Sequence, residues 1–415
     1  MNRKIKKGIR LFLFFIIILG FASCVPKDNE KTLSEIEVKK ASTEITEKNK
    51  IKIEETKAKK GTTEVSLGVT GDIMYHPWTF FRNVDSEGNY DFSFFYRDVE
   101  DLIESFDLMA GNYETTSTPK RKMEGYPLFN TPSNSITQLK ESGFDILTTS
   151  NNHCLDSRVE GIIDTIDALD TNGIKHTGTF KLDERPFLIV EKNNIKIGIL
   201  AYSQMFNGMD PILSQEKRSM INPMNSEVME RDVKKLKEQV DFLIVFPHWG
   251  EEYMFTPTEF QKNNGHNLLS WGADIVIGSH PHVLQPIEEV DVDGVKKYIF
   301  YSMGNSISGQ RQEYNGLREV EAGLIANLKI KKDLDKEITT LEGIELHPTW
   351  VKIDKTTGVV QGKVTSIKDY LPGGKLETSV PQDVKNRILE IGNRSVDILE
   401  SMGYNTGLKG EIWYL

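Results

Sequence analysis

The feature that most constrains the fold is a series of short β-branched runs that alternate with amphipathic segments. Seven runs predict strands, at residues 65–70, 107–110, 145–149, 196–201, 242–246, 274–278 and 297–302. Helical patterns lie between several of them, at residues 96–105, 133–142, 159–172, 226–240 and 258–271. This alternation is typical of α/β proteins with extended β-sheet, which is the fold class that the sequence predicts.

Two local patterns refine this prediction. Thr256, Pro257 and Glu259 have the spacing of a helix start, with Thr256 as the cap and Glu259 closing a capping box. Further strand is expected over residues 339–365, and a peripheral helix, concerned with packing rather than chemistry, over residues 381–402.

Polar residues that can bind metal ions follow almost every predicted strand. They are Asp72, Asn112, Glu114, Asn152, His153, His248, His280, His282 and Asn305. In α/β sheets, ligands bind beyond the carboxyl ends of the strands, so these clusters predict one convergent site.

The residue types at these strand ends favour a metal centre. The chain has eight histidines, and four of them lie in these clusters. His280 and His282 are separated by one residue, so in extended backbone both rings would face the same side. Imidazole and oxygen ligands without thiolates suit one or two divalent ions, with Zn, Mn or Fe as candidates. A carboxylate that bridges two cations is the usual basis of a hydrolytic pair.

The first 63 residues predict export and tethering. Five basic residues precede the apolar run at residues 11–19, and small residues precede Cys24. This pattern predicts a lipoprotein signal peptide over residues 1–23 and lipidation of Cys24; an uncleaved anchor is the alternative. Residues 24–63 are rich in Lys, Glu and Thr, which predicts a disordered membrane tether; a charged helix is the alternative. Both N-terminal alternatives place the body on the extracytoplasmic face of the cell membrane.

The charge balance bears on possible partners. The formal net charge is −10, and removal of residues 1–23 would leave −15. A nucleic-acid partner is therefore not expected. A polyanionic polymer would be repelled unless metal ions or local cations offset the charge.

Six ordered motifs carry a resemblance to a known family. They are Thr-Gly-Asp (70–72), Asn-Tyr-Glu (112–114), Ser-Asn-Asn-His (150–153), His-Trp-Gly (248–250), Ser-His-Pro-His (279–282) and Tyr-Ser-Met-Gly-Asn (301–305). In this order they look like the CapA family of poly-γ-glutamate capsule-synthesis proteins, itself similar to calcineurin-like metallophosphoesterases. The resemblance implies a β-sandwich flanked by helices over residues 64–351, with the metal site at the strand ends. Residues 352–415 would then be a C-terminal extension.

The resemblance also implies roles for individual residues. The metal ligands of these phosphoesterase-like proteins correspond to Asp72, Glu114, Asn152, His248, His280 and His282, with Glu114 as the bridging carboxylate. Their catalytic histidine corresponds to His153. One departure matters, because Met74 stands where phosphoesterases usually have a histidine. A neighbour would have to complete that metal site, and His76 is a candidate. Ser279 in place of glycine is a smaller departure.

Several nearby residues allow two interpretations. Asp156 could orient His153 or cap the following helix, and Asn112 and Asn305 could support ligands or contact substrate. Cys154 is expected to be a buried free thiol, and Trp249 and Trp271 to be core residues. Possible substrate contacts are Arg158, Lys175, Glu251 and Glu252.

Two functional hypotheses follow. In the first, the protein is a metal-dependent hydrolase of a phosphoester or amide in the synthesis of poly-γ-glutamate or a related envelope polymer. In the second, it is a non-catalytic assembly or polymer-binding factor. In both, membrane-embedded components of a capsule polymer synthase are the expected partners.

Overall fold

The computed structural model describes residues 61–355 and 358–409. The expected signal peptide, the lipidation site at Cys24 and nearly all of the expected tether lie outside the described residues. The end of that tether is an exception, because the first strand, β1 (Thr62–Ile73), already begins at residue 62. Thr62 and Thr63 pair there with Asp333 and Lys332. Within the described ranges, no helix is both long enough and apolar enough to cross a bilayer.

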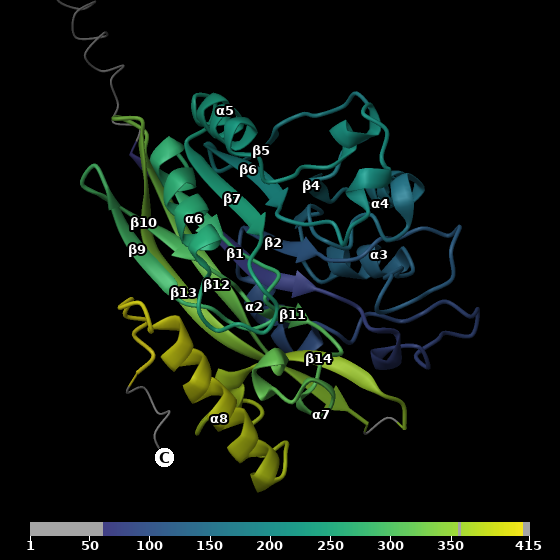
Figure 1. The fold of residues 1–415 in the computed structure, drawn as a ribbon. Helices are drawn as coiled ribbons and strands as arrows, with labels where there is room; N and C mark the ends of the chain where they lie inside the picture. Colours follow the sequence, from purple (N-terminus) through teal and green to yellow (C-terminus); the bar gives the residue numbers. More distant parts are fainter. Residues whose placement is uncertain (1–60, 356–357, 410–415) are drawn as a thin grey trace, which may run out of the picture. The chain divides into compact units, whose positions relative to one another are not determined.

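Two sheets form the centre of the described body (Figure 1). The eight-stranded sheet contains β1, β2 (Leu108–Tyr113), β3 (Ile146–Thr148), β4 (Lys175–Thr177), β11 (Asn305–Ile307), β12 (Ala322–Asp333), β13 (Ile338–Asp354) and β14 (Gln361–Ser366). Its order is β14-β13-β12-β1-β2-β3-β4, with β11 beside β1. The six-stranded sheet contains β5 (Leu188–Lys192), β6 (Ile195–Ser203), β7 (Phe242–His248), β8 (Ile275–Ile277), β9 (Ile287–Val292) and β10 (Val295–Phe300). Its order is β5-β6-β7-β8-β10-β9.

The sheets pack face to face through their apolar sides. Val65, Leu67 and Val69 of β1 belong to one buried cluster with Ile197 and Ile199 of β6. Each such side chain contributes about 1.5–3 kcal/mol through its removal from water. The β-branched runs therefore form strands that are held between two layers.

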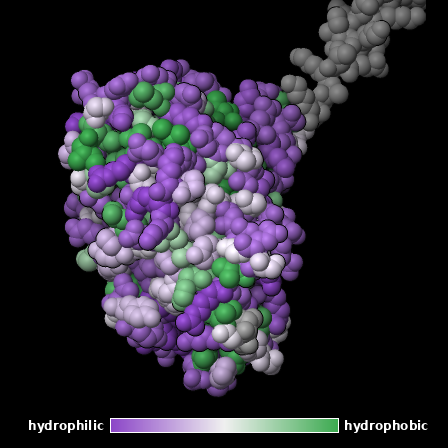
Figure 2. Space-filling view, turned by 90° about the vertical axis from the view of Figure 1, so that its right-hand side faces the viewer, coloured by the Kyte–Doolittle hydropathy of each residue, from purple (hydrophilic) through white to green (hydrophobic). Residues whose placement is uncertain are grey.

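Helices cover the outer faces of both sheets, which confirms the expected β-sandwich flanked by helices. The described residues contain the α-helices α2 (Glu100–Glu104), α3 (Asn134–Glu141), α4 (Arg158–Thr171), α5 (Ser226–Lys237), α6 (Glu259–Trp271), α7 (Gln312–Asn315) and α8 (Gln382–Leu399), of which α2 to α6 cover these outer faces. Residues of α5 and α6 pack on β7 and β8, and residues of α2, α3 and α4 belong to the cluster on the outer side of the larger sheet. Figure 2 shows that one face of the body is mostly hydrophilic, with its hydrophobic side chains in small groups.

The C-terminal region is more closely joined to the body than the sequence suggested. Strand β13 continues past residue 351 to Asp354, and β14 pairs with it, so the expected boundary after residue 351 runs through a sheet. Ile388, Ile391 and Leu399 of α8 belong to the cluster between the sheets. The amphipathic stripe of this helix therefore extends the main core.

The start of α6 differs from the expected one. Thr258, and not Thr256, caps the helix, and Gln261 completes the capping box in place of Glu259. Gln261 is fully buried and also donates to Gln285 Oε1 over 2.7 Å. This second bond explains why the helix starts after Thr258. A start after Thr258 places the buried Gln261 in the capping box, where it also contacts Gln285.

Candidate metal centre

The carboxyl ends of strands from both sheets meet at one edge. Asp72 lies in β1, Glu114 directly follows β2, and His248 ends β7. Gly71 makes this edge possible, since a Cβ there would lie 2.0 Å from the carbonyl oxygen of Gly304. The sequence therefore brings its strand-end clusters together, as the α/β pattern predicts.

Two carboxylates form the centre of the site. Asp72 accepts hydrogen bonds from Asn112 Nδ2 at 2.8 Å and from the His280 backbone N–H at 3.1 Å. Burial would raise the pKa of Asp72, but bonds to His282 and Asn112 and the charges of His282 and His248 outweigh it and lower the pKa. Burial, and then the charge of Asp72, raise the pKa of Glu114 well above its ordinary value.

Glu114 gives the clearest sign that this centre is built to hold a cation. Its Oε1 is buried and accepts no hydrogen bond from any described residue. A buried carboxylate oxygen without a partner carries a large desolvation cost. Neighbouring imidazoles lie close to it, with His248 Nε2 at 3.5 Å and His282 Nε2 at 3.7 Å. A divalent cation at this position would satisfy all three groups.

The histidines are packed so closely that protonation of all of them is unfavourable. His248 Nε2 lies 3.1 Å from His280 Nδ1 and 3.0 Å from Asn152 Oδ1. Burial, with the charge of His282, lowers the pKa of His280 to about 3. Burial, with the charge of His280, lowers the pKa of His248 well below its ordinary value. Neutral imidazole is the form that binds metal ions.

Three overlapping groups have ligand atoms within 4.8 Å of one another. They are Glu114–His248–His280, Asp72–Glu114–His282 and Glu252–His280–His282. Glu114 belongs to two of them, which is the arrangement expected of a bridging carboxylate. Asn152 adds an amide oxygen beside His248. The mixed nitrogen and oxygen donors fit divalent ions such as Zn, Mn or Fe.

The backbone at the two loop histidines corrects one part of the sequence argument. His280 and His282 have φ values of 100° and 57°, so the segment is not extended. Their ring centroids are nevertheless 5.9 Å apart. The rings come together because the chain turns after β8, not because of strand alternation.

His153 stands beside the metal ligands as the candidate proton donor. Its Nδ1 lies 2.7 Å from Asp156 Oδ2, which also accepts the Phe129 backbone N–H. Because a carboxylate only accepts, Nδ1 donates to Asp156, and Nε2 is left to carry the proton that would be transferred in the pocket. Ser157 is the N-cap residue of α4, so Asp156 orients His153 and is not the helix cap.

His76 is absent from the three ligand groups. Its Nδ1 accepts the Gly309 backbone N–H at 3.0 Å, and burial lowers its pKa to about 4. Glu252 stands with His280 and His282 instead, although sequence reasoning had named it only as a possible substrate contact. Met74 at the histidine position indicated that a further ligand was needed, but no sequence signal separated Glu252 from Glu251.

The remaining candidates separate into supporting residues and residues that are not part of the cluster. Asn112 contacts Asp72, and Asn305 Oδ1 lies 3.1 Å from His282 Nδ1. Cys154 is buried, and burial raises its thiol pKa to about 12. Trp249 is fully buried in the core, and Trp271 packs against the same cluster. Exposed side chains outside the ligand groups are Arg158, Lys175 and Glu251.

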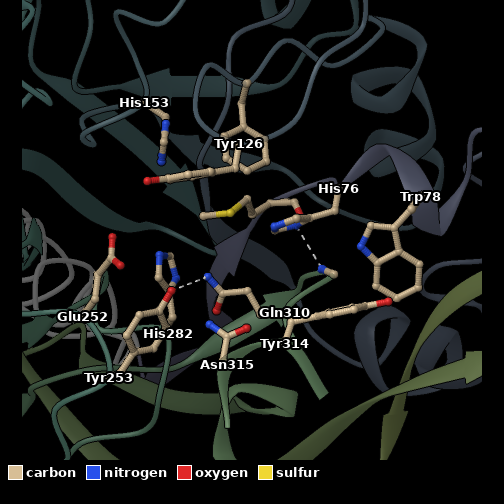
Figure 3. A pocket seen from close by; sticks show the side chains of 13 residues that line it. His76, Trp78, Tyr126, His153, Glu252, Tyr253, His282, Gln310, Tyr314 and Asn315 are labelled. Atoms are coloured by element: carbon tan, nitrogen blue, oxygen red, sulfur yellow. Dashed lines mark hydrogen bonds between the residues drawn. The ribbon is translucent and has the colours of Figure 1, made fainter. Parts of the chain in front are cut away.

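A pocket of about 300 Å³ opens beside the centre (Figure 3). His153, Glu252 and His282 lie along one part of it, and Gln310 and Asn315 lie near His282. Five aromatic residues also line it: Trp78, Tyr126, Phe129, Tyr253 and Tyr314. A substrate in this pocket would lie against both the metal ligands and the candidate proton donor.

Comparisons with known proteins identify relatives of this chain. The family described as "Bacterial capsule synthesis protein PGA_cap" matches residues 66–310. The "PGA biosynthesis protein CapA" of Bacillus subtilis (strain 168) is 27% identical over 312 residues, which are 73% of this chain and 78% of that protein. The "Capsule biosynthesis protein CapA" of Bacillus anthracis is 28% identical over 260 residues, 60% of each chain.

Solved structures give more distant similarities. The calcineurin-like phosphoesterase YfkN from Bacillus subtilis has a TM-score of 0.41 and 15% identity, over 80% of this chain and 98% of that one. A phosphatase from Mycoplasma pneumoniae has a TM-score of 0.41 and 14% identity, over 73% of this chain and 95% of that one.

Proposed function

Because the chain belongs to the bacterial capsule synthesis protein family PGA_cap, we propose that it is a metal-dependent hydrolase in the synthesis of poly-γ-glutamate or a related envelope polymer. The single observation that carries the hydrolase assignment is Glu114. Its buried, unpartnered oxygen lies between histidines of two ligand groups, next to a pocket that also contains His153.

The centre can support hydrolysis through a division of roles. Divalent ions, when bound, would lower the pKa of water and neutralise developing negative charge on a phosphoester or amide. Asp72, Glu114, Asn152, His248, His280 and His282 are the residues that would hold them. His153 Nε2, oriented through Nδ1 by Asp156, would deliver a proton to the leaving group. The aromatic side chains of the pocket would position the substrate and exclude water.

Glu252 is proposed as the ligand that replaces the histidine missing at Met74. Glu252→Gln is expected to lower the affinity for one of two bound ions. The loss should exceed the 10–100-fold that is typical when a supporting residue is removed. The control is Glu251→Gln, which removes the same charge from the adjacent exposed position. Metal content after dialysis against a defined Mn concentration measures the effect. Equal metal content in the two variants would refute the role of Glu252.

The hydrolase assignment is tested by assaying the purified metal-loaded protein on phosphoesters and γ-glutamyl amides. Turnover that disappears with a chelator and returns with Mn or Zn supports it. A metal-loaded, folded protein that cleaves neither bond type would contradict it.

A non-catalytic role in capsule assembly is the second candidate, and one observation favours it. The two relatives from Bacillus are named for biosynthesis and not for hydrolysis. In this role the metal ions would bind carboxylates of the polymer beside a membrane-embedded synthase. Capsule formation that survives His153→Ala but fails with His282→Ala would favour this candidate.

We further propose that the protein is anchored by a lipid on Cys24 at the extracytoplasmic face of the cell membrane. The basic segment, the apolar run and the small residues before Cys24 support this placement. A palmitate analogue should label the wild-type protein in cells and leave Cys24→Ala unlabelled. Equal labelling of both proteins would refute lipidation at this position.

A further inference from the structure

We propose that the pocket beside the metal centre binds an uncharged sugar ring, so that the substrate is a sugar phosphoester rather than a γ-glutamyl amide. This inference rests on the proposed hydrolase function and selects between its two bond types. It is carried by the charge, the aromatic surface and the amide groups of the pocket (Figure 3).

The charge of the pocket disfavours a polyanion. None of the thirteen described residues that line it is Lys or Arg, and Glu252 adds a carboxylate. A γ-glutamyl polymer carries a free carboxylate on every residue, next to each amide. Those carboxylates of such a chain that the metal ions do not reach would face Glu252, with no Lys or Arg among the lining residues, and like charges in such contact are disfavoured. Bound metal ions would neutralise the reacting phosphate, but no lining Lys or Arg is left to pair with further carboxylates.

The aromatic surface fits a ring that has apolar C–H faces. Tyr126 and Tyr314 are 80% and 73% exposed, which is unusual for large side chains that lie beside a buried centre. Trp78 and Tyr314 contact each other edge to face, with ring centroids 6.0 Å apart. Aromatic faces cover the C–H faces of a sugar ring. The hydroxyl groups at the edge of the sugar ring remain free for hydrogen bonds.

The wall that carries Trp78 is already formed. A Cβ at Gly309 would lie 2.6 Å from Trp78 Nε1, so only glycine allows the backbone to approach the indole this closely. The Gly309 N–H also fixes His76 of the same wall. A preformed wall lowers the cost of ordering side chains around a ligand.

Amide groups provide partners for hydroxyls. Gln310 and Asn315 line the pocket, and Gln310 Nε2 donates to the hydroxyl of Tyr253 over 3.3 Å. Amide side chains both donate and accept, as sugar hydroxyls do. Together with the stacking surface they favour a sugar over a plain hydrocarbon group.

Hydrolysis of such a substrate requires only water as a second reactant. Water supplies a hydroxyl group to phosphorus, and the bond between phosphorus and the sugar oxygen breaks. His153 gives a proton to that oxygen and recovers one from the water. The products are a phosphate and a sugar with a free hydroxyl group.

The test compares three phosphoesters and one amide on the metal-loaded full chain. Glucose 1-phosphate offers a neutral ring, glucuronic acid 1-phosphate an anionic ring, and glycerol 3-phosphate no ring; γ-glutamyl-4-nitroanilide offers the amide. We expect kcat/KM for glucose 1-phosphate to exceed each other value by about tenfold or more, equivalent to about 1.4 kcal/mol. Tyr314→Ala should reduce the preference for glucose over glycerol, whereas Phe260→Ala, an exposed aromatic on α6, should not.

Calorimetric binding separates failure of this inference from failure of the proposed function. Methyl glucoside should bind the metal-loaded protein more tightly than tri-γ-glutamate, and Tyr314→Ala should weaken it. Hydrolysis of glycerol 3-phosphate equal to that of glucose 1-phosphate would overturn the sugar assignment and leave the hydrolase intact. Tighter binding of tri-γ-glutamate would also overturn it. If no substrate is cleaved but the glucoside binds at Tyr314, the hydrolase fails and the sugar site stands.

Discussion

Replacing His153 by alanine is expected to lower the hydrolytic rate by about 10²–10⁴-fold, the usual contribution of a positioned general acid. Bound metal should not change, because His153 belongs to none of the three ligand groups. Its Nδ1 is held by Asp156, so the variant removes a proton donor whose orientation is already fixed. Single-turnover rates and metal content on the same samples measure both quantities.

The matched control is His266→Ala. His266 is a histidine on α6 whose side chain is 47% exposed and pairs with Glu288, away from the metal centre. Its replacement should leave rate and metal content unchanged. If the His153 variant keeps a rate within threefold of the wild type, His153 is not the acid. If it loses metal together with activity, it is a ligand, and the division of roles proposed for the site is wrong.

Replacing Glu114 by glutamine is expected to abolish most of the stabilisation that metal ions give. Glu114 is shared by two ligand groups, so the change affects both ions. At a metal concentration 100 times the wild-type Kd, binding stabilises the fold by about 2.7 kcal/mol. A variant with 100-fold weaker binding would gain only about 0.4 kcal/mol at the same concentration.

In the metal-free protein, Glu114→Gln should not lower the stability of the fold. Glu114 and Asp72 are both buried, and the pKa of Glu114 is raised by burial and by the charge of Asp72. Glutamine removes that unfavourable charge, so the metal-free variant should be at least as stable as the metal-free wild type. Unfolding in denaturant with and without Mn gives both values. The control is Glu345→Gln at an exposed position.

His280→Ala and His282→Ala should also lower the amount of bound metal.

The sequence predicted those features that depend on local pattern. Val65, Leu67 and Val69 show the alternation of a half-buried strand, and the structure places all three between the sheets. The convergence of the strand-end ligands was also predictable, because neighbouring parallel strands place their carboxyl ends on one edge of a sheet. Alternation also predicted an extended His280–His282 segment, and there it failed, because the chain turns directly after β8.

Features that depend on distant contacts were not predictable from a local pattern. Gln261 completes the capping box of α6 and also donates to Gln285, which is 24 residues away. A peripheral helix was expected over residues 381–402, yet its Ile388 and Ile391 join the main core. Glu252 was indistinguishable from Glu251 in sequence. Only the loop after β7 brings Glu252 to His280 and His282.

The most direct measurement of the central claim is the metal content of the full-length wild-type protein. The protein would be purified, supplemented with Mn or Zn, dialysed and analysed by mass spectrometry for every divalent metal. The structure, with Glu114 shared between two ligand groups, predicts two ions per chain in the wild type and loss of both in Glu114→Gln. A folded wild-type protein that retains no divalent ion after supplementation would contradict the metal centre and, with it, the hydrolase.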